Sequence, residues 1–205
     1  MTKQTTISKA VSLSGVGIHT GKKVKLTFKP APVNHGYAFS RVDLEGTPVI
    51  KADANLVVNT TRGTNLEKNG VSIQTSEHVL AALVGLEIDN VLIELNASEP
   101  PIMDGSSIHF VEALLEAGIE EQDAERYEYV VRENITFADE ETGSEITVIP
   151  ADNYQVTTMV DFGTKVLGTQ NANLKNLADF KDQFANARTF SSVSYTHLTL
   201  PTTSP

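Results

Sequence analysis

The chain has 205 residues, of which 40% are hydrophobic and 20% charged, so it is too apolar for a disordered protein and long enough for one or two folded domains. The 16 Lys and Arg and the 26 Asp and Glu give a net charge of −10, which argues against a general nucleic-acid-binding protein. The absence of cysteine excludes disulfides, thiol nucleophiles and Cys-ligated zinc, and no apolar run approaches the roughly 20 residues of a membrane span.

The glycine-rich stretch at 15–23 is the first local signal in the chain. Only three residues separate Gly17 from Gly21, whereas a phosphate-binding loop has four residues between its glycines. Thr20 stands where a dinucleotide-binding fingerprint has its third glycine. We therefore interpret the stretch as a tight connection between two strands.

Strands dominate the first 60 residues. Apolar and polar residues alternate over 23–29, which predicts a strand that turns Val24, Leu26 and Phe28 towards a core. Further strands are expected at 37–42, 52–58 and, after the first helix, 90–95.

A hairpin and a helix are expected next. The Asn-Gly pair at 69–70 separates two short apolar runs, and both residue types tolerate the positive φ of a tight hairpin turn. Thr75 or Ser76 is expected to cap the helix, in which Glu77 suits the positive end of the helix dipole. Gly85 is expected to end it.

The first unit is expected to close with a second helix. Ser106 can cap this helix and Gly118 can end it. The acidic stretch from 120 to 126 follows and is the best candidate for a domain boundary. We therefore assign a first α+β unit to residues 1–122.

Strands resume in the second half of the chain, where they are expected at 127–137, 144–149 and 154–162. Asn176 is expected to cap a third helix. Strands followed by a helix, twice, favour two α+β units over a parallel sheet, so 127–190 is assigned to the start of a second unit. Residues 191–205 are rich in Ser, Thr and Pro without a period, which predicts a disordered or foreign tail.

Glu77 and His78 are the pair of adjacent residues best suited to catalysis. Metal-assisted hydrolysis uses an imidazole to bind zinc and a carboxylate to accept a proton from water. No histidine follows four residues later, so the pair is not the metalloprotease helix motif. The residues alone leave both alternatives open, a metal ligand and a hydrogen-bonded histidine at a helix start.

Five segments in order carry a resemblance to a known family: GVGIHTGK (15–22), SEHVLAAL (76–83), GLEIDN (85–90), PIMDGS (101–106) and ARTF (187–190). Together they resemble the UDP-3-O-acyl-N-acetylglucosamine deacetylases, zinc hydrolases of lipid A synthesis. The stretch 161–170 is most similar to members fused to a 3-hydroxyacyl-carrier-protein dehydratase. The resemblance ends at about Phe190.

The resemblance implies a fold and a reaction. The family fold has two similar α+β units, each a sheet with helices on one face, and the helices face each other around the active site. The second unit would be incomplete in this chain. The family removes the N-acetyl group of the UDP-sugar and releases acetate, with Zn as cofactor and the UDP-acyl-sugar as substrate.

The resemblance also implies roles for five residues. His78 corresponds to the first zinc ligand and Glu77 to the general base. Thr189 corresponds to the hydroxyl that stabilises the oxyanion of the tetrahedral intermediate. Phe162 corresponds to the residue that stacks near the uridine, and His19 lies in a motif near the substrate.

The chain departs from the family after the ARTF motif. The other zinc ligands of the family, a His and an Asp on one helix, come later, and His197 has no Asp beside it that would make it a substitute. We therefore expect a truncated chain that binds no stoichiometric zinc and does not turn over the UDP-sugar.

Two other interpretations stay open. One is a non-enzymatic domain that binds a sugar nucleotide or a protein partner, and the other is a defective pseudogene product. The chain is expected to be cytoplasmic and to bind no nucleic acid. A transient contact with a membrane surface and the oligomeric state are left open.

Overall fold

A computed structural model describes residues 2–189 and shows an α+β fold, as expected from the sequence. Its main sheet has five strands in the order β2-β3-β9-β4-β5. Their bounds are Val11–Val16 for β2, Lys23–Pro30 for β3, Val91–Leu95 for β9, Tyr37–Arg41 for β4 and Val49–Lys51 for β5. Neighbours are antiparallel except β4 and β9, which run parallel. The alternation predicted for β3 is confirmed, because Val24, Leu26 and Phe28 are buried.

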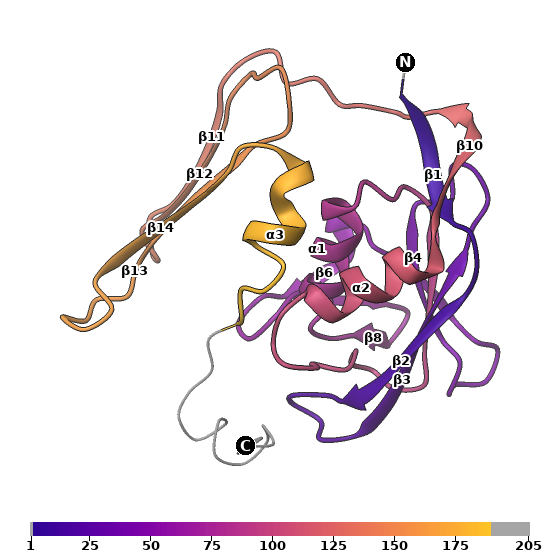
Figure 1. The fold of residues 1–205 in the computed structure, drawn as a ribbon. Helices are drawn as coiled ribbons and strands as arrows, with labels where there is room; N and C mark the ends of the chain where they lie inside the picture. The colour runs from indigo at the N-terminus through magenta and orange to yellow at the C-terminus, as the bar shows by residue number, and fades with distance from the viewer. Residues whose placement is uncertain (1, 190–205) are drawn as a thin grey trace.

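Two helices pack on the apolar face of this sheet: α1 (Glu77–Gly85) and α2 (Ile108–Ala117), which lie close together (Figure 1). The rings of Phe28 on β3 and Phe110 on α2 meet edge to face, with centroids 6.4 Å apart and planes at 86°. Gly118, with φ of 76°, ends α2 as predicted. None of the helices between residues 2 and 189 is long and apolar enough to cross a membrane.

The acidic stretch at 120–126 lies almost entirely within a strand, which the sequence did not predict, and the chain leaves the first unit directly after it. Strand β10 (Ile119–Glu125) pairs antiparallel with β1 (Lys3–Ile7). Arg126, directly after it, forms ion pairs with Glu87 at 3.0 Å and Asp89 at 2.9 Å. Backbone pairing with β1 tolerates the exposed charged side chains of this stretch, because strand hydrogen bonds are made by the main chain.

A small sheet of β6 (Val57–Asn59), β7 (Asn65–Lys68) and β8 (Val71–Ile73) precedes α1. The predicted hairpin joins β7 to β8, with φ of 52° at Asn69 and 76° at Gly70. The strand expected at 52–58 is mostly absent, because Ala54–Leu56 forms a 3-10 turn, η1. The Asp53 side chain caps this turn by accepting a hydrogen bond from the backbone N–H of Asn55.

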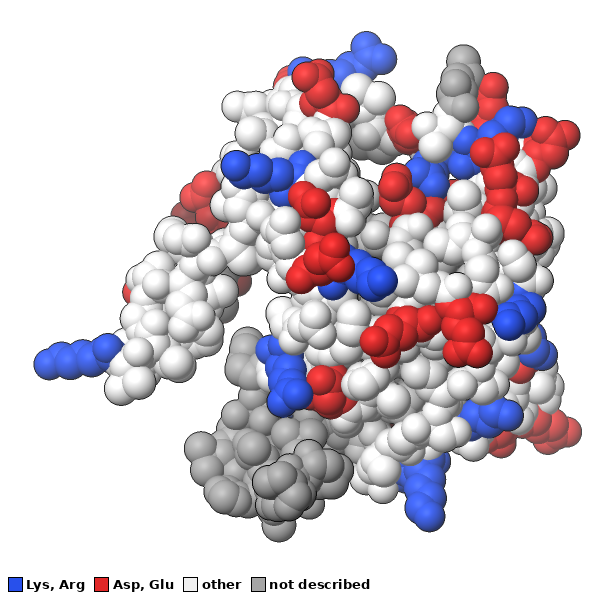
Figure 2. Space-filling model, in the orientation of Figure 1, with Lys and Arg blue, Asp and Glu red and all other residues white. Residues whose placement is uncertain are grey.

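The second half of the chain projects from the first as an arm of two antiparallel hairpins (Figure 1). The strands are β11 (Ile135–Asp139), β12 (Ser144–Val148), β13 (Val156–Asp161) and β14 (Thr169–Leu174). Residues 127–134, expected to begin a strand, form none. The arm carries little charge on the face seen in Figure 2, and Phe137 and Met159 are 67% and 74% exposed.

The chain returns from the arm to the first unit through η2 (Leu177–Asp179) and the short helix α3 (Phe180–Gln183). Asn176 caps η2 through its side chain, as predicted. The Phe180 ring packs against α1 at Gly85, where an added Cβ would lie 2.1 Å from Cδ1 of the ring. The absence of a side chain at Gly85 therefore lets α3 approach α1. The predicted tail, 191–205, lies outside the described residues.

Candidate active site

Glu77 and His78 begin α1, and the backbone of Thr64 holds this helix start in place. The carbonyl of Thr64 accepts a hydrogen bond from the Ser76 hydroxyl at 2.9 Å, and its N–H donates to Oε2 of Glu77 at 2.8 Å. The predicted side-chain cap is absent, because the Thr75 hydroxyl donates to Glu99 instead. The segment before β7 therefore orients the carboxylate of Glu77.

Gly63 permits this close approach. Its φ is 149°, and a Cβ at this position would lie 3.1 Å from Oε1 of Glu77 and 3.3 Å from Cα of Thr75. Within residues 2–189, Oε1 of Glu77 accepts no hydrogen bond, whereas Oε2 is fixed by Thr64. One oxygen of a half-buried, oriented carboxylate is thus available to accept a proton.

His78 is half-buried beside Glu77, and its ring forms no hydrogen bond with another described residue. Burial lowers the pKa of His78 below its ordinary value of 6.5, although the charges of Glu77 and Asp104 act in the opposite direction. The imidazole is therefore predominantly neutral at pH 7, which is the form that binds a metal ion.

The lowered pKa of His78 predicts a pH dependence of stability. Since the folded chain holds this proton less tightly than the unfolded chain, the stabilisation is complete above the unfolded pKa of 6.5 and is lost as pH falls towards the folded pKa. His78→Gln is therefore expected to lose less free energy of unfolding than wild type between pH 7.5 and pH 5.5. Urea unfolding at both pH values measures this, and an equal loss in both proteins would contradict it.

A second group of residues ties the end of the described chain to the turn before α2. The N–H of Thr189 donates to the carbonyl of Gly105 at 2.8 Å, and Arg188 forms an ion pair with Asp104 at 3.3 Å. The same carboxylate accepts hydrogen bonds from the hydroxyl and N–H of Ser106 at 2.6 and 3.1 Å. The exposed Thr189 is thus placed beside the Asp104 turn, whose charge also acts on His78.

Asp104 is charged at neutral pH. Burial raises its pKa, but the hydrogen bonds from Ser106 and the charges of His109 and Arg188 outweigh burial and hold the pKa below its ordinary value of 3.8. The imidazole of His109 lies 3.5 Å from Oδ1 of Asp104. The sequence indicated only a turn here, so this ion-paired junction was missed.

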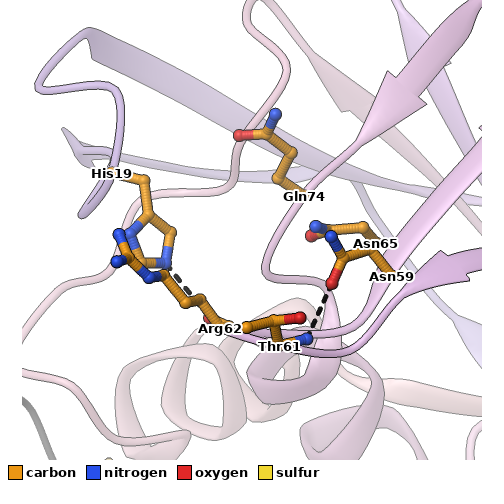
Figure 3. Close-up of a pocket in the computed structure, with 6 residues that line it drawn as sticks. All are labelled: His19, Asn59, Thr61, Arg62, Asn65 and Gln74. Atoms are coloured by element: carbon orange, nitrogen blue, oxygen red, sulfur yellow. Dashed lines mark hydrogen bonds between the residues drawn. The ribbon is translucent and has the colours of Figure 1, made fainter.

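His19 lies on one wall of a hollow of about 380 Å³ (Figure 3). Its Nε2 is 3.1 Å from the carbonyl oxygen of Arg62, on the segment that leads to Thr64 and Glu77. The hollow is lined by His19, Asn59, Thr61, Arg62, Asn65 and Gln74. These side chains are polar, and two of them are basic, so the hollow suits a polar or anionic group.

The family is decided by comparison of the whole sequence. A sequence model of the UDP-3-O-acyl N-acetylglycosamine deacetylases (LpxC) matches residues 4–198. The chain belongs to this deacetylase family. The five ordered segments thus predicted the family correctly.

Relatives within the deacetylase family differ in length. The chain is 47% identical over 190 residues to the bifunctional enzyme LpxC/FabZ of Bacteroides thetaiotaomicron. The aligned stretch covers 93% of this chain and 41% of that protein. It is 42% identical over 195 residues to the UDP-3-O-acyl-N-acetylglucosamine deacetylase of Hahella chejuensis. Here the aligned stretch covers 93% of this chain and 63% of that protein. The chain therefore spans less than two thirds of either relative.

Phe162 lies apart from the other site residues that the deacetylase resemblance implied. It follows β13 in the turn to β14, where its N–H donates to the carbonyl of Gly168 at 3.1 Å. This end of the hairpin points away from α1 (Figure 1). The structure thus brings Glu77 and His78 together, places His19 beside the segment that orients Glu77, and leaves Phe162 on the arm.

A catalytic zinc site needs several protein ligands. Catalytic zinc normally has three protein ligands and one open position. Between residues 2 and 189, no three His, Cys, Asp or Glu side chains gather in a way that could hold a metal ion. These residues alone do not fit a catalytic zinc ion, and His78 offers a single imidazole.

Proposed function

We propose that this chain supplies part of the active site of a cytoplasmic deacetylase that hydrolyses the N-acetyl amide of UDP-3-O-acyl-N-acetylglucosamine and releases acetate. The observation that carries the proposal is the helix start of α1, where an oriented carboxylate lies next to a neutral imidazole without a hydrogen bond to residues 2–189. Membership of the deacetylase family supports the same reaction.

Glu77 is the proposed general base. One of its oxygens is held by the N–H of Thr64, and the other can take a proton from water as the water oxygen attacks the acetyl carbonyl carbon. The carbon–nitrogen bond then breaks, the proton passes to the departing amine of the sugar, and acetate leaves. The spacing of Glu77 and His78 on adjacent residues keeps both groups at one helix end.

Three further residues have proposed roles. The hydroxyl of Thr189 would donate to the oxygen that becomes negative in the transition state, and its segment is anchored to the Asp104 turn. His19 would contact the polar part of the substrate from the hollow that it lines. Phe162 would stack near the uridine, and this role requires the β13–β14 hairpin to move towards the start of α1.

We propose His78 as one ligand of the zinc ion of this deacetylase. The neutral ring at pH 7 suits this role. Zinc, when bound, polarises a carbonyl group and lowers the pKa of water. Since residues 2–189 do not gather three ligands, we assign the chemistry of this part of the chain to Glu77 and Thr189.

A hybrid protein tests the proposal. Residues 4–189 would replace the matching stretch of the Hahella chejuensis deacetylase, to which the chain is 42% identical. The hybrid is expected to release acetate from UDP-3-O-acyl-N-acetylglucosamine, and Glu67→Gln, which changes an exposed residue of β7, is expected to leave the rate unchanged. A folded hybrid that binds the sugar nucleotide without releasing acetate would favour the non-enzymatic binding domain.

A further inference from the structure

Glu99 is a completely buried carboxylate between β9 and α2 that the sequence did not mark as functional. Its oxygens accept hydrogen bonds from the N–H of His19 at 3.1 and 3.2 Å and from the N–H of Thr20 at 3.0 Å. The hydroxyls of Thr20 and Thr75 donate to it at 2.9 and 3.2 Å. The carboxylate thus joins the glycine-rich loop to Thr75, which lies two residues before the start of α1.

These contacts explain the glycine-rich loop. Successive backbone N–H groups in a turn form a site for an anion, and in this loop the anion is the chain's own carboxylate. Gly17 must lack a side chain, because a Cβ would lie 2.4 Å from Oε2 of Glu99 and 2.5 Å from Oγ1 of Thr20. The backbone N–H groups of His19 and Thr20, which could otherwise face an external anion, both donate to Glu99.

The hydrogen bonds take the place of an ion pair. No Lys, Arg or His between residues 2 and 189 forms a salt bridge with Glu99, so loop donors must stabilise the buried oxygens. A carboxyl group without such donors would be costly to bury. The loop and the carboxylate therefore fix each other's positions.

Both segments held by Glu99 lead to the candidate active site. His19 reaches from the loop to the Arg62 carbonyl on the wall of the hollow (Figure 3). Thr75 has a φ of 52°, a strained value for a residue other than glycine, and lies two residues before Glu77. A shift of Glu99 would therefore move His19 relative to the Glu77–His78 pair.

We propose that Glu99 is a positioning residue that sets the imidazole of His19 relative to Glu77 and His78 for binding of the sugar nucleotide. This inference rests on the proposed function. Glu99 touches neither substrate nor reacting atoms, and it acts through His19 and Thr75. A glutamine at this position would present an N–H₂ group to N–H and O–H donors, which removes acceptors from the loop.

The test measures binding of UDP-N-acetylglucosamine to the 205-residue chain by NMR titration in a double-mutant cycle. Glu99→Gln is expected to weaken binding about tenfold, since hydrogen bonds to a charged group are lost, and to add less than about twofold on the His19→Ala background. Glu94→Gln on β9 breaks the ion pair with Lys29 on β3 and is the matched control, with unchanged binding expected. Full additivity of Glu99→Gln and His19→Ala would overturn the proposal.

A second readout separates this proposal from the proposed function. The ring resonances of His19 and the amide resonance of Thr20 are expected to shift in Glu99→Gln and to stay in place in Glu94→Gln, whether or not the probe binds. Unchanged His19 resonances would overturn the positioning role. Failure of the wild-type chain to bind the probe, together with shifted His19 resonances, would count against the proposed function alone.

Thr20→Val keeps the test available where Glu99→Gln does not fold. It removes the hydroxyl that donates to Oε2 of Glu99 and leaves the carboxylate in place. The His19 ring resonances are expected to shift in the same variant. A folded Thr20→Val chain with wild-type His19 resonances would overturn the proposal.

Discussion

Glu77→Gln in the hybrid deacetylase is expected to lower the rate of acetate release about 10²- to 10⁴-fold, the range typical of a lost general base. The glutamine oxygen can still accept the hydrogen bond from the N–H of Thr64, so the start of α1 is expected to keep its conformation. The loss of rate would then report the loss of proton acceptance. Steady-state release of acetate at saturating substrate measures the effect.

The control for this variant is Glu67→Gln, which makes the same chemical change at an exposed site on β7. Circular dichroism would verify that both variants are folded. A Glu77→Gln hybrid that retains a rate within about threefold of its parent would contradict the role of Glu77 as general base, because such a loss is below the range for that role.

Phe28→Ala is expected to lower the free energy of unfolding of the 205-residue chain by about 3–5 kcal/mol. Phe28 is 0% exposed, and its ring forms an edge-to-face contact with the ring of Phe110, with centroids 6.4 Å apart. The truncation removes this contact and leaves a cavity between β3 and α2 that the packed core fills only in part. Urea unfolding followed by circular dichroism measures the change.

Phe137→Ala is the matched control for the core substitution. Phe137 lies on β11 and is 67% exposed, so the same truncation is expected to change the free energy of unfolding by less than about 0.5 kcal/mol. Equal effects of the two substitutions would contradict the assignment of the stable core to the first unit.

The local elements that the sequence predicted well are those whose signals act over a few residues. The alternation in β3, the Asn69–Gly70 hairpin turn and the glycine that ends α2 depend on side-chain period and on φ preference. The acidic composition at 120–126 did not predict strand β10, because its partner β1 lies more than a hundred residues away and leaves no trace in the composition of the stretch.

In the candidate site too, the features that depend on neighbouring residues were predicted, and those that depend on distant partners were not. Glu77 and His78 are adjacent in the sequence, so their proximity needed no tertiary structure. The cap predicted for α1 failed because the hydroxyls of Thr75 and Ser76 have partners distant in sequence, Glu99 and Thr64. A local pattern shows that a side chain can donate a hydrogen bond, but it does not show which acceptor the fold brings near.

The sequence by itself determined the α+β class, the family and the Glu77–His78 pair, because these depend on local periodicity and on short motifs in a fixed order. Only the tertiary structure decided that Thr64 orients Glu77, that Asp104 anchors the Thr189 segment, and that Glu99 occupies the glycine-rich loop. These contacts join residues from 13 to 84 positions apart, the shortest separation being Thr64 to Glu77 and the longest Arg188 to Asp104. Burial and chain topology create them, and neither is encoded in any single stretch of sequence.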